Sequence, residues 1–175
     1  MNSKLRSVMR YIVKNYPYPD DLTKTRITKL VYLIDWENVK EYGSQITNIE
    51  WFFDHYGPYV SDVLDEADED KTVSINSTIS NFGTVKYIVK PKRDKEELLY
   101  DDLTDNDKDI IDRVIDRTKN FYWNEFINYV YSTDPIKNGT KYSALDLKSF
   151  GWLYNQVEQL NKKWAGGADK NLDTY

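Results

Sequence analysis

The segment ITKLVYLID, residues 27–35, decides the fold of this chain. Ile27, Leu30, Val31 and Ile34 follow the i, i+3, i+4, i+7 spacing that places apolar side chains on one face of a helix. Tyr32, Leu33 and Trp36 make the other side of this helix apolar as well. A helix that is apolar all round is surrounded by protein rather than lying on the surface. The segment therefore predicts a buried central helix, which we expect to end near Gly43.

Helices are also predicted on both sides of this segment. Upstream, an amphipathic helix is indicated by Leu5, Val8, Met9 and Ile12, and it ends at the run Tyr16-Pro17-Tyr18-Pro19. Downstream, residues 61–69 are typical of a short acidic helix.

The apolar period changes from helical to alternating after residue 70. Val73, Ile75 and Ile79 lie two or four residues apart, and Val85, Tyr87 and Val89 alternate with lysines. The turn between the two runs is Asn81-Phe82-Gly83, whose glycine tolerates positive φ. This pattern predicts an antiparallel β-hairpin.

The rest of the chain returns to helical spacing. Thr104, with Asp107 three residues later, is typical of a helix N-terminus, and a helix should run from there to Thr118. Two more helices are indicated by the apolar sets Trp123, Phe126, Ile127, Val130 and Leu153, Val157, Leu160, Trp164, with breaks at Asp134-Pro135 and Asn138-Gly139. The sequence thus predicts a mainly α (α+β) fold: a compact helical domain of about six helices with one inserted antiparallel β-hairpin or small sheet. We expect one domain over residues 1–164 and a flexible C-terminal tail over residues 165–175.

Composition narrows the possible functions. The 175 residues contain no cysteine and one histidine, so disulfides, thiolate zinc sites and cysteine nucleophiles are excluded. The net charge of −5 disfavours broad binding to nucleic acid. Residues 1–30, however, carry seven basic side chains and two acidic ones, so a DNA-binding regulator stays open as a lesser alternative. Charged residues interrupt every apolar run before the about 18 residues that a membrane span needs, and no signal peptide is recognisable. We expect a cytoplasmic protein that does not contact the membrane.

No pattern typical of catalysis or of a bound cofactor is present. His55 lacks the G-x-S-x-G context of a hydrolase, and the acidic run at residues 62–70 lacks the glycine that a calcium loop requires. No glycine-rich phosphate loop occurs either. The sequence therefore predicts no catalytic residue, no metal and no cofactor.

The segment WFFDHYGPYV, residues 51–60, allows two interpretations. In one, Trp51 and Phe53 point inward, and Gly57 and Pro58 form a sharp corner, with Pro58 in the first position of the following helix. In the other, outward aromatic side chains near Tyr56 or Tyr59 contact another protein, because interface hot spots are enriched in aromatic residues. Both can hold at once, with the corner as scaffold and the rings as the contact.

These two segments together resemble one protein family. ITKLVYLID and the segment IEWFFDHYGPYVSDV (residues 49–63), which begins about twenty residues after Ile27, are similar to the Panacea antitoxin domain of SocA-like and phage-associated GepA-like proteins. That family has a KLLYFAD-like helix before a W-x-YGP-V-like segment. FINYVYSTDP (residues 126–135) matches a further apolar helix end of the family, although the family pattern has a histidine nearby.

The resemblance implies a non-enzymatic antitoxin that neutralises a cognate toxin, usually encoded beside it, by direct binding. Three alternatives stay open: a phage-encoded protein that binds a host defence or replication factor, a proteolytic adaptor that hands a toxin to a host protease, and, less favoured, the DNA-binding regulator. The residues expected to bind the partner are Trp51, Phe53, Tyr56 and Tyr59. The residues expected to be structural are Asp35, Gly57, Pro58, Asp134 and Pro135.

Overall fold

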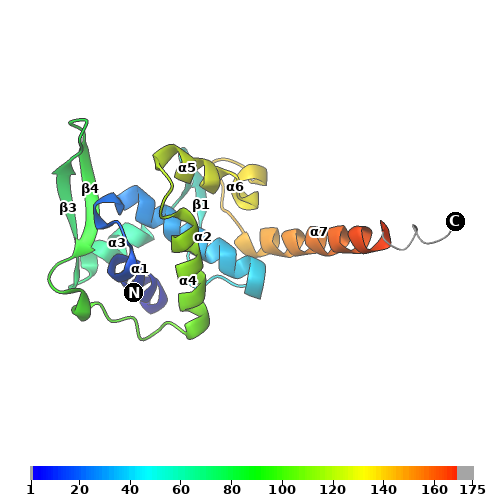
Figure 1. The fold of residues 1–175 in the computed structure, drawn as a ribbon, viewed down its shortest axis with the longest axis horizontal. Coiled ribbons are helices and arrows are strands. Elements are labelled where there is room, and N and C mark those ends of the chain that lie inside the picture. Colours follow the sequence, from blue (N-terminus) through cyan, green and yellow to red (C-terminus); the bar gives the residue numbers. More distant parts are fainter. Residues whose placement is uncertain (1, 169–175) are drawn as a thin grey trace.

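Helix α2 (Lys24–Tyr42) runs through the middle of the protein, and the other elements surround it (Figure 1). The computed structural model describes residues 2–168. Thr23 caps the start of α2 by accepting a hydrogen bond from the Arg26 N–H, and Gly43 ends the helix in the left-handed conformation. Ile27, Tyr32 and Leu33, which point to different sides of the helix, are at most 1% exposed. The predicted buried helix and its end at Gly43 are confirmed.

The predicted class, mainly α with a small antiparallel β part, is confirmed. Among the described residues there are seven α-helices: α1 (Ser3–Asn15), α2, α3 (Asp62–Glu69), α4 (Asp105–Thr118), α5 (Trp123–Tyr131), α6 (Asp134–Asn138) and α7 (Leu147–Ala168). Two short 3₁₀ helices cover Pro19–Asp21 and Lys95–Glu97. Four strands form two separate hairpins: β1 (Phe52–Asp54) with β2 (Gly57–Tyr59), and β3 (Val73–Ile79) with β4 (Val85–Pro91).

Helix α1 packs its predicted apolar face into the core beside α2, α3 and α4. Leu5, Val8, Met9 and Ile12 are all at most 2% exposed. The polar edge of the helix is tied to its neighbours by ion pairs, such as the one from Lys4 Nζ to Asp107 Oδ2 at 2.6 Å. One continuous core therefore joins the N-terminal helix to the middle of the chain.

The β3–β4 hairpin forms where the alternating pattern predicts it. Its register runs from Val73 opposite Pro91 to Ile79 opposite Val85, and Gly83 in the turn has φ +75°. The inner end of β4 is fixed to the body, because the Val89 N–H donates to the Leu22 carbonyl at 2.9 Å. The outer end extends away from the helices (Figure 1).

Helix α4 begins with the predicted capping box, in which the side chains of Thr104 and Asp107 each accept a hydrogen bond from the other residue's N–H. The predicted break after α5 is also present, and Asp134 and Pro135 form the first turn of α6. Tyr32 Oη lies 2.8 Å from Thr133 Oγ1, which attaches this break to α2.

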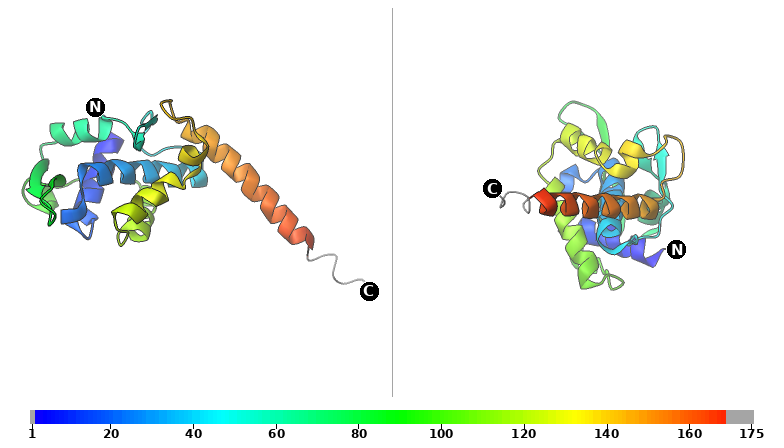
Figure 2. Two further views of the ribbon diagram at one scale, coloured as in Figure 1. Left: turned by 90° about the horizontal axis from the view of Figure 1, so that it is seen from above. Right: turned by 90° about the vertical axis from the view of Figure 1, so that its right-hand side faces the viewer.

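Helix α7 leaves the body after its first turns and projects away from it (Figure 1 and Figure 2). Because α7 continues to Ala168, the first four residues of the predicted tail, 165–168, are helical. The remainder of that prediction, residues 169–175, lies outside the described residues.

Candidate protein-binding surfaces

Asp35 organises the loop that leads from α2 to β1. Its carboxylate is completely buried and accepts hydrogen bonds from the N–H groups of Ile46 and Thr47 and from the side chains of Gln45, Thr47 and Trp51. Burial raises the pKa of Asp35, and the hydrogen bonds from Thr47, Trp51 and Gln45 oppose that rise. Asp35 is therefore the anchor that fixes the loop and the Trp51 ring, in line with the structural role expected for it.

Trp51 and Phe53 belong to the core of the free chain. They are 1% and 7% exposed, while Phe52 between them is 39% exposed, as strand alternation requires. The expectation that Trp51 and Phe53 contact a partner does not fit this burial, since neither ring contributes appreciable surface. Tyr56 and Tyr59 are 77% and 39% exposed, so they stay available as contact residues.

Lys29 of α2 holds the β1–β2 hairpin against the helix. Its ammonium donates to the carbonyl oxygens of Tyr56 and Pro58, each at 2.8 Å, and its side chain is buried. Burial lowers the pKa of Lys29 to about 8. Sequence reasoning placed Lys29 among the basic side chains of residues 1–30 and missed this role, because its two acceptors lie far along the chain.

We predict that Lys29 makes the stability of the protein depend on pH. Between pH 8 and 10.5 the folded chain binds fewer protons at Lys29 than the unfolded chain, so the free energy of unfolding rises with pH, by at most about 3 kcal/mol. Lys29→Met should remove this rise, whereas Lys137→Met, at an exposed position, should keep it. Urea unfolding at several pH values measures the difference. Parallel pH curves for the wild type and Lys29→Met would contradict the assignment.

Gly57 and Pro58 form the turn side of the β1–β2 hairpin rather than a helix start. Gly57 has φ +92° and pairs with Asp54, and Pro58 pairs with Phe53 inside β2. The prediction that Pro58 occupies the first position of a helix is therefore wrong, because α3 begins only at Asp62. The sharp corner itself is present.

Gly57→Ala should cost about 1–3 kcal/mol of unfolding free energy, because the backbone conformation is strained for an L residue. In addition, an added Cβ would lie 3.2 Å from Tyr131 Cε2. Gly43→Ala is the matched control, since φ is also positive there but nothing lies within 4 Å. Thermal unfolding of both variants should show the larger loss for Gly57→Ala. Equal losses would mean that Tyr131 does not crowd this corner.

Asp134 and Pro135 shape the start of α6. Pro135 is buried and fits the first turn of the helix, where a missing N–H is tolerated. Asp134 is the first residue of α6, so the capping position before the helix belongs to Thr133. Thr133, which bonds to the Val130 carbonyl and pairs with Tyr32, supplies the polar contacts of this turn.

His55 lies in an exposed aromatic cluster at the tip of the β1–β2 hairpin. Its Nδ1 is 2.8 Å from Tyr142 Oη, and its ring packs edge-on against Tyr56 with centroids 4.5 Å apart. Within the described residues no group of three or more histidine, aspartate or glutamate side chains could hold a metal ion. Across the same residues, no helix combines the length and the apolar character that crossing a membrane requires.

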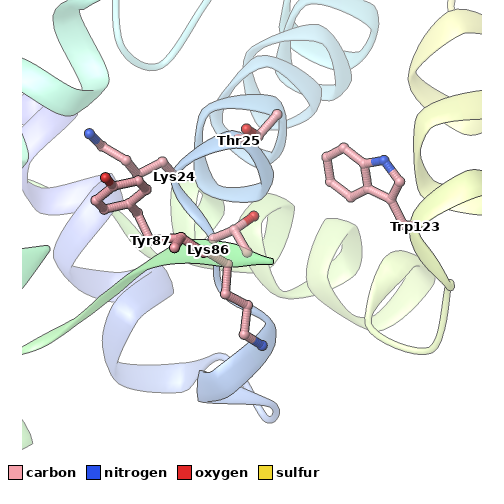
Figure 3. A pocket seen from close by; sticks show the side chains of 7 residues that line it. Lys24, Thr25, Lys86, Tyr87 and Trp123 are labelled. Atoms are coloured by element: carbon pink, nitrogen blue, oxygen red, sulfur yellow. The ribbon is translucent and has the colours of Figure 1, made fainter. Parts of the chain in front are cut away.

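A concave surface rich in aromatic residues lies between β4 and the start of α5, and we name it the β4–α5 groove. One hollow of about 330 Å³ is lined by the side chains shown in Figure 3, Lys24, Thr25, Lys86, Tyr87 and Trp123, together with Thr23 and Val85. A second hollow of about 640 Å³ shares three of these residues and adds aromatic rings: it is lined by Asp21, Thr23, Arg26, Ser80, Phe82, Thr84, Lys86, Phe121, Tyr122 and Trp123. The two hollows therefore form one continuous surface.

Four aromatic side chains of this groove are unusually open to solvent. Phe82 is 95% exposed, Tyr122 83%, Tyr87 50% and Trp123 45%. Large exposed apolar patches on soluble proteins mark interaction sites more often than chance. A positive charge borders them, because Lys24 Nζ lies 5.1 Å from the centre of the Tyr87 ring.

One wall of the groove is an open strand edge. In an antiparallel pair, the backbone groups of every second residue form hydrogen bonds to the neighbouring strand, and those of the residues between point outward. The Val89 N–H donates outward to Leu22, so the backbone groups of the odd-numbered residues of β4 point away from β3. The N–H and C=O groups of Val85 and Tyr87 thus point toward the groove. An antiparallel bridge between Thr23 and Ile88 covers the inner end of this edge as far as the Tyr87 carbonyl, and the part that stays open is the Val85 backbone and the Tyr87 N–H, to which no other described residue bonds. An open strand edge is a template for pairing with another chain.

Sequence reasoning predicted the hairpin and the α5 helix but missed the groove between them. Tyr87 and Trp123 come from elements that are distant in the sequence. The available signal was local: Phe82 at a turn tip and Tyr122-Trp123 at a helix start put large apolar side chains where polar residues are usual.

Comparison with known proteins gives one match. The family model described as "Antitoxin SocA-like, Panacea domain" matches residues 27–135, which is more than half of the chain. The matched range begins at the first residue of ITKLVYLID and ends at Pro135. No curated protein and no solved structure matches the chain.

Proposed function

Because the chain belongs to the SocA-like antitoxin family with a Panacea domain, we propose that it neutralises a cognate toxin by binding it directly. The family match over residues 27–135 is the observation that carries this proposal. The toxin is expected to be a protein encoded next to this chain. Neutralisation in this account occurs by occupying the toxin and needs no catalytic step.

The toxin is proposed to bind in the β4–α5 groove through an extended segment. Adding a strand to an open edge supplies main-chain hydrogen bonds, and pockets beside that edge select the side chains of the added segment. The outward backbone groups of Val85 and the outward N–H of Tyr87 provide the edge, while Phe82 and Trp123 provide apolar walls. Because Lys24 borders the groove, a segment that alternates apolar and acidic residues fits best.

The tip of the β1–β2 hairpin is proposed as a second contact. Tyr56 is 77% exposed and is held in place through its own carbonyl by Lys29. Tyr59 is exposed on the adjacent strand. Because Lys29 fixes the backbone at Tyr56 and the His55 ring packs against the Tyr56 ring, the side chain has less conformational freedom to lose on binding, which favours affinity.

Co-expression tests the proposed function. The product of the neighbouring reading frame, expressed alone, should stop growth, and co-expression of this chain should restore growth and give a complex that co-purifies. If the neighbour is harmless, or if growth is restored without any complex, direct neutralisation is wrong. A host protease or a phage or host factor in the purified complex would favour the adaptor or host-factor alternatives instead.

A further inference from the structure

The projecting part of α7 carries an exposed apolar stripe. Leu153, Val157, Leu160 and Trp164 are 53%, 47%, 55% and 79% exposed. Their spacing of four, three and four residues is the spacing of a coiled-coil seam, which needs a second helix to cover it. Figure 2 shows that this part of α7 extends well beyond the body of the protein.

The face of α7 that packs against the body of the protein is not the face that carries the stripe. An added Cβ at Gly151 would lie 2.3 Å from Val39 Cγ1, so α7 crosses α2 closely at this glycine. One turn later, Asn155 Nδ2 donates to the Lys40 carbonyl at 3.1 Å. At about 100° per residue these positions lie nearly opposite the stripe. The stripe is therefore not needed for attachment of the helix.

We propose that α7 pairs with α7 of a second copy of this chain. The stripe is apolar along its whole length, and the charged residues Glu158 and Lys162 lie on the other side of the helix. Of the positions that border the seam, only Lys163 is charged, so two copies meet without a row of like charges. Charged bordering positions are what selects a different partner helix. Because α7 has almost no charged residues at these bordering positions, a second copy of this chain fits the stripe better than a different helix chosen by its charges.

The pairing is antiparallel. A hollow of about 520 Å³ at the base of α7 is lined by Lys148, Ser149, Trp152 and Leu153. Residues at i, i+3 and i+4, such as Ser149, Trp152 and Leu153, form the kind of hole that receives a side chain from a facing helix. Antiparallel pairing places Trp164 of one copy against Leu153 and this hollow in the other.

The same register also matches the rest of the stripe. With Leu153 opposite Trp164, Val157 lies opposite Leu160, and the arrangement is the same in both directions because the pair has two-fold symmetry. Parallel pairing would instead place Trp164 of one chain against Trp164 of the other and leave the hollows unfilled.

The area is sufficient for a weak to moderate dimer. The exposed parts of the four stripe side chains and of Trp152, which lies beside the stripe and lines the hollow, set an upper limit on the order of 600 Å² per copy, given 150–250 Å² for a whole aromatic side chain. Twice this area reaches the lower end of the about 1,200–2,000 Å² buried in specific interfaces. Pairing through α7 requires no toxin.

Sedimentation of the full chain tests the pairing. The wild type should be a dimer at micromolar concentrations, and Leu160→Glu should raise the dissociation constant by at least about 100-fold, since each substitution occurs twice in the interface. Leu99→Glu is the matched control, because Leu99 is 57% exposed and lies outside α7. All three proteins should melt at similar temperatures. A monomeric wild type, or a Leu160→Glu protein that still dimerises, would overturn the proposal.

Introduced cysteines test the direction, because the chain has none of its own. A mixture of Leu153→Cys and Trp164→Cys should form a disulfide-linked heterodimer on mild oxidation, since a disulfide requires Cα atoms within about 7 Å. Leu153→Cys alone should stay uncrosslinked, because its copies lie about three helical turns apart. Efficient self-crosslinking of Leu153→Cys, with none in the mixture, would overturn the antiparallel arrangement.

Discussion

Asp35→Ala should lower the free energy of unfolding by about 3–5 kcal/mol, because it leaves several buried hydrogen-bond donors without an acceptor. The carboxylate accepts hydrogen bonds from two backbone N–H groups and from the Trp51 indole at 2.9 Å, and the site is closed to water. For a domain of this size the melting temperature should fall by on the order of 10 °C. Urea unfolding of the wild type and the variant measures the loss.

Asp68→Ala is the matched control for this change, since Asp68 is an exposed aspartate of α3 without a hydrogen-bond partner among the described residues. Its unfolding free energy should stay within about 0.5 kcal/mol of the wild type. Asp35→Asn keeps the shape of the side chain and should fall between the two. A loss for Asp35→Ala no larger than for Asp68→Ala would show that the Asp35 loop does not depend on its carboxylate.

Local signals in the sequence were sufficient for most of the fold. The helical spacing from Ile27 to Ile34 predicts a buried helix, and the Thr104–Asp107 pair predicts a helix start, because each signal acts within one or two turns. The β3–β4 hairpin is equally local, since its two strands join through one short turn containing Gly83.

Long-range contacts account for what the sequence did not predict. Pro58 suits a helix start as well as an edge strand, and the choice is made by pairing with Phe53 and by the Lys29 contacts from α2. Similarly, the apolar spacing of α7 predicts a helix correctly but cannot tell whether its stripe is covered. The Tyr87 and Trp123 walls of the β4–α5 groove meet only in the folded chain.

Trp123→Ala should weaken toxin binding by about 30-fold or more, as expected for a central aromatic hot spot. Trp123 lines both hollows of the groove, so its removal deletes the wall that the toxin segment would pack against. Tyr87→Ala should have a comparable effect. Tyr42→Ala is the matched control for Tyr87→Ala, because Tyr42 is 49% exposed, Tyr87 is 50% exposed, and Tyr42 lies outside the groove. Calorimetric titration of the toxin with each variant measures these changes.

Tyr87→Pro separates strand addition from simple apolar contact. Its N–H faces the groove and takes no part in the β3–β4 ladder, so proline removes one donor from the open edge and is tolerated in the hairpin. If the toxin adds a strand there, Tyr87→Pro should bind clearly more weakly than Tyr87→Ala. Equal affinities would mean that the toxin packs on the rings without pairing with β4.

Titration of the purified toxin with this chain tests direct, non-catalytic neutralisation most directly. Toxin activity should fall linearly as the chain is added and vanish at equal molar amounts, with no dependence on incubation time. Complete loss of toxin activity at amounts far below equivalence, growing with time, would contradict binding as the mechanism, and so would full activity in the presence of excess chain.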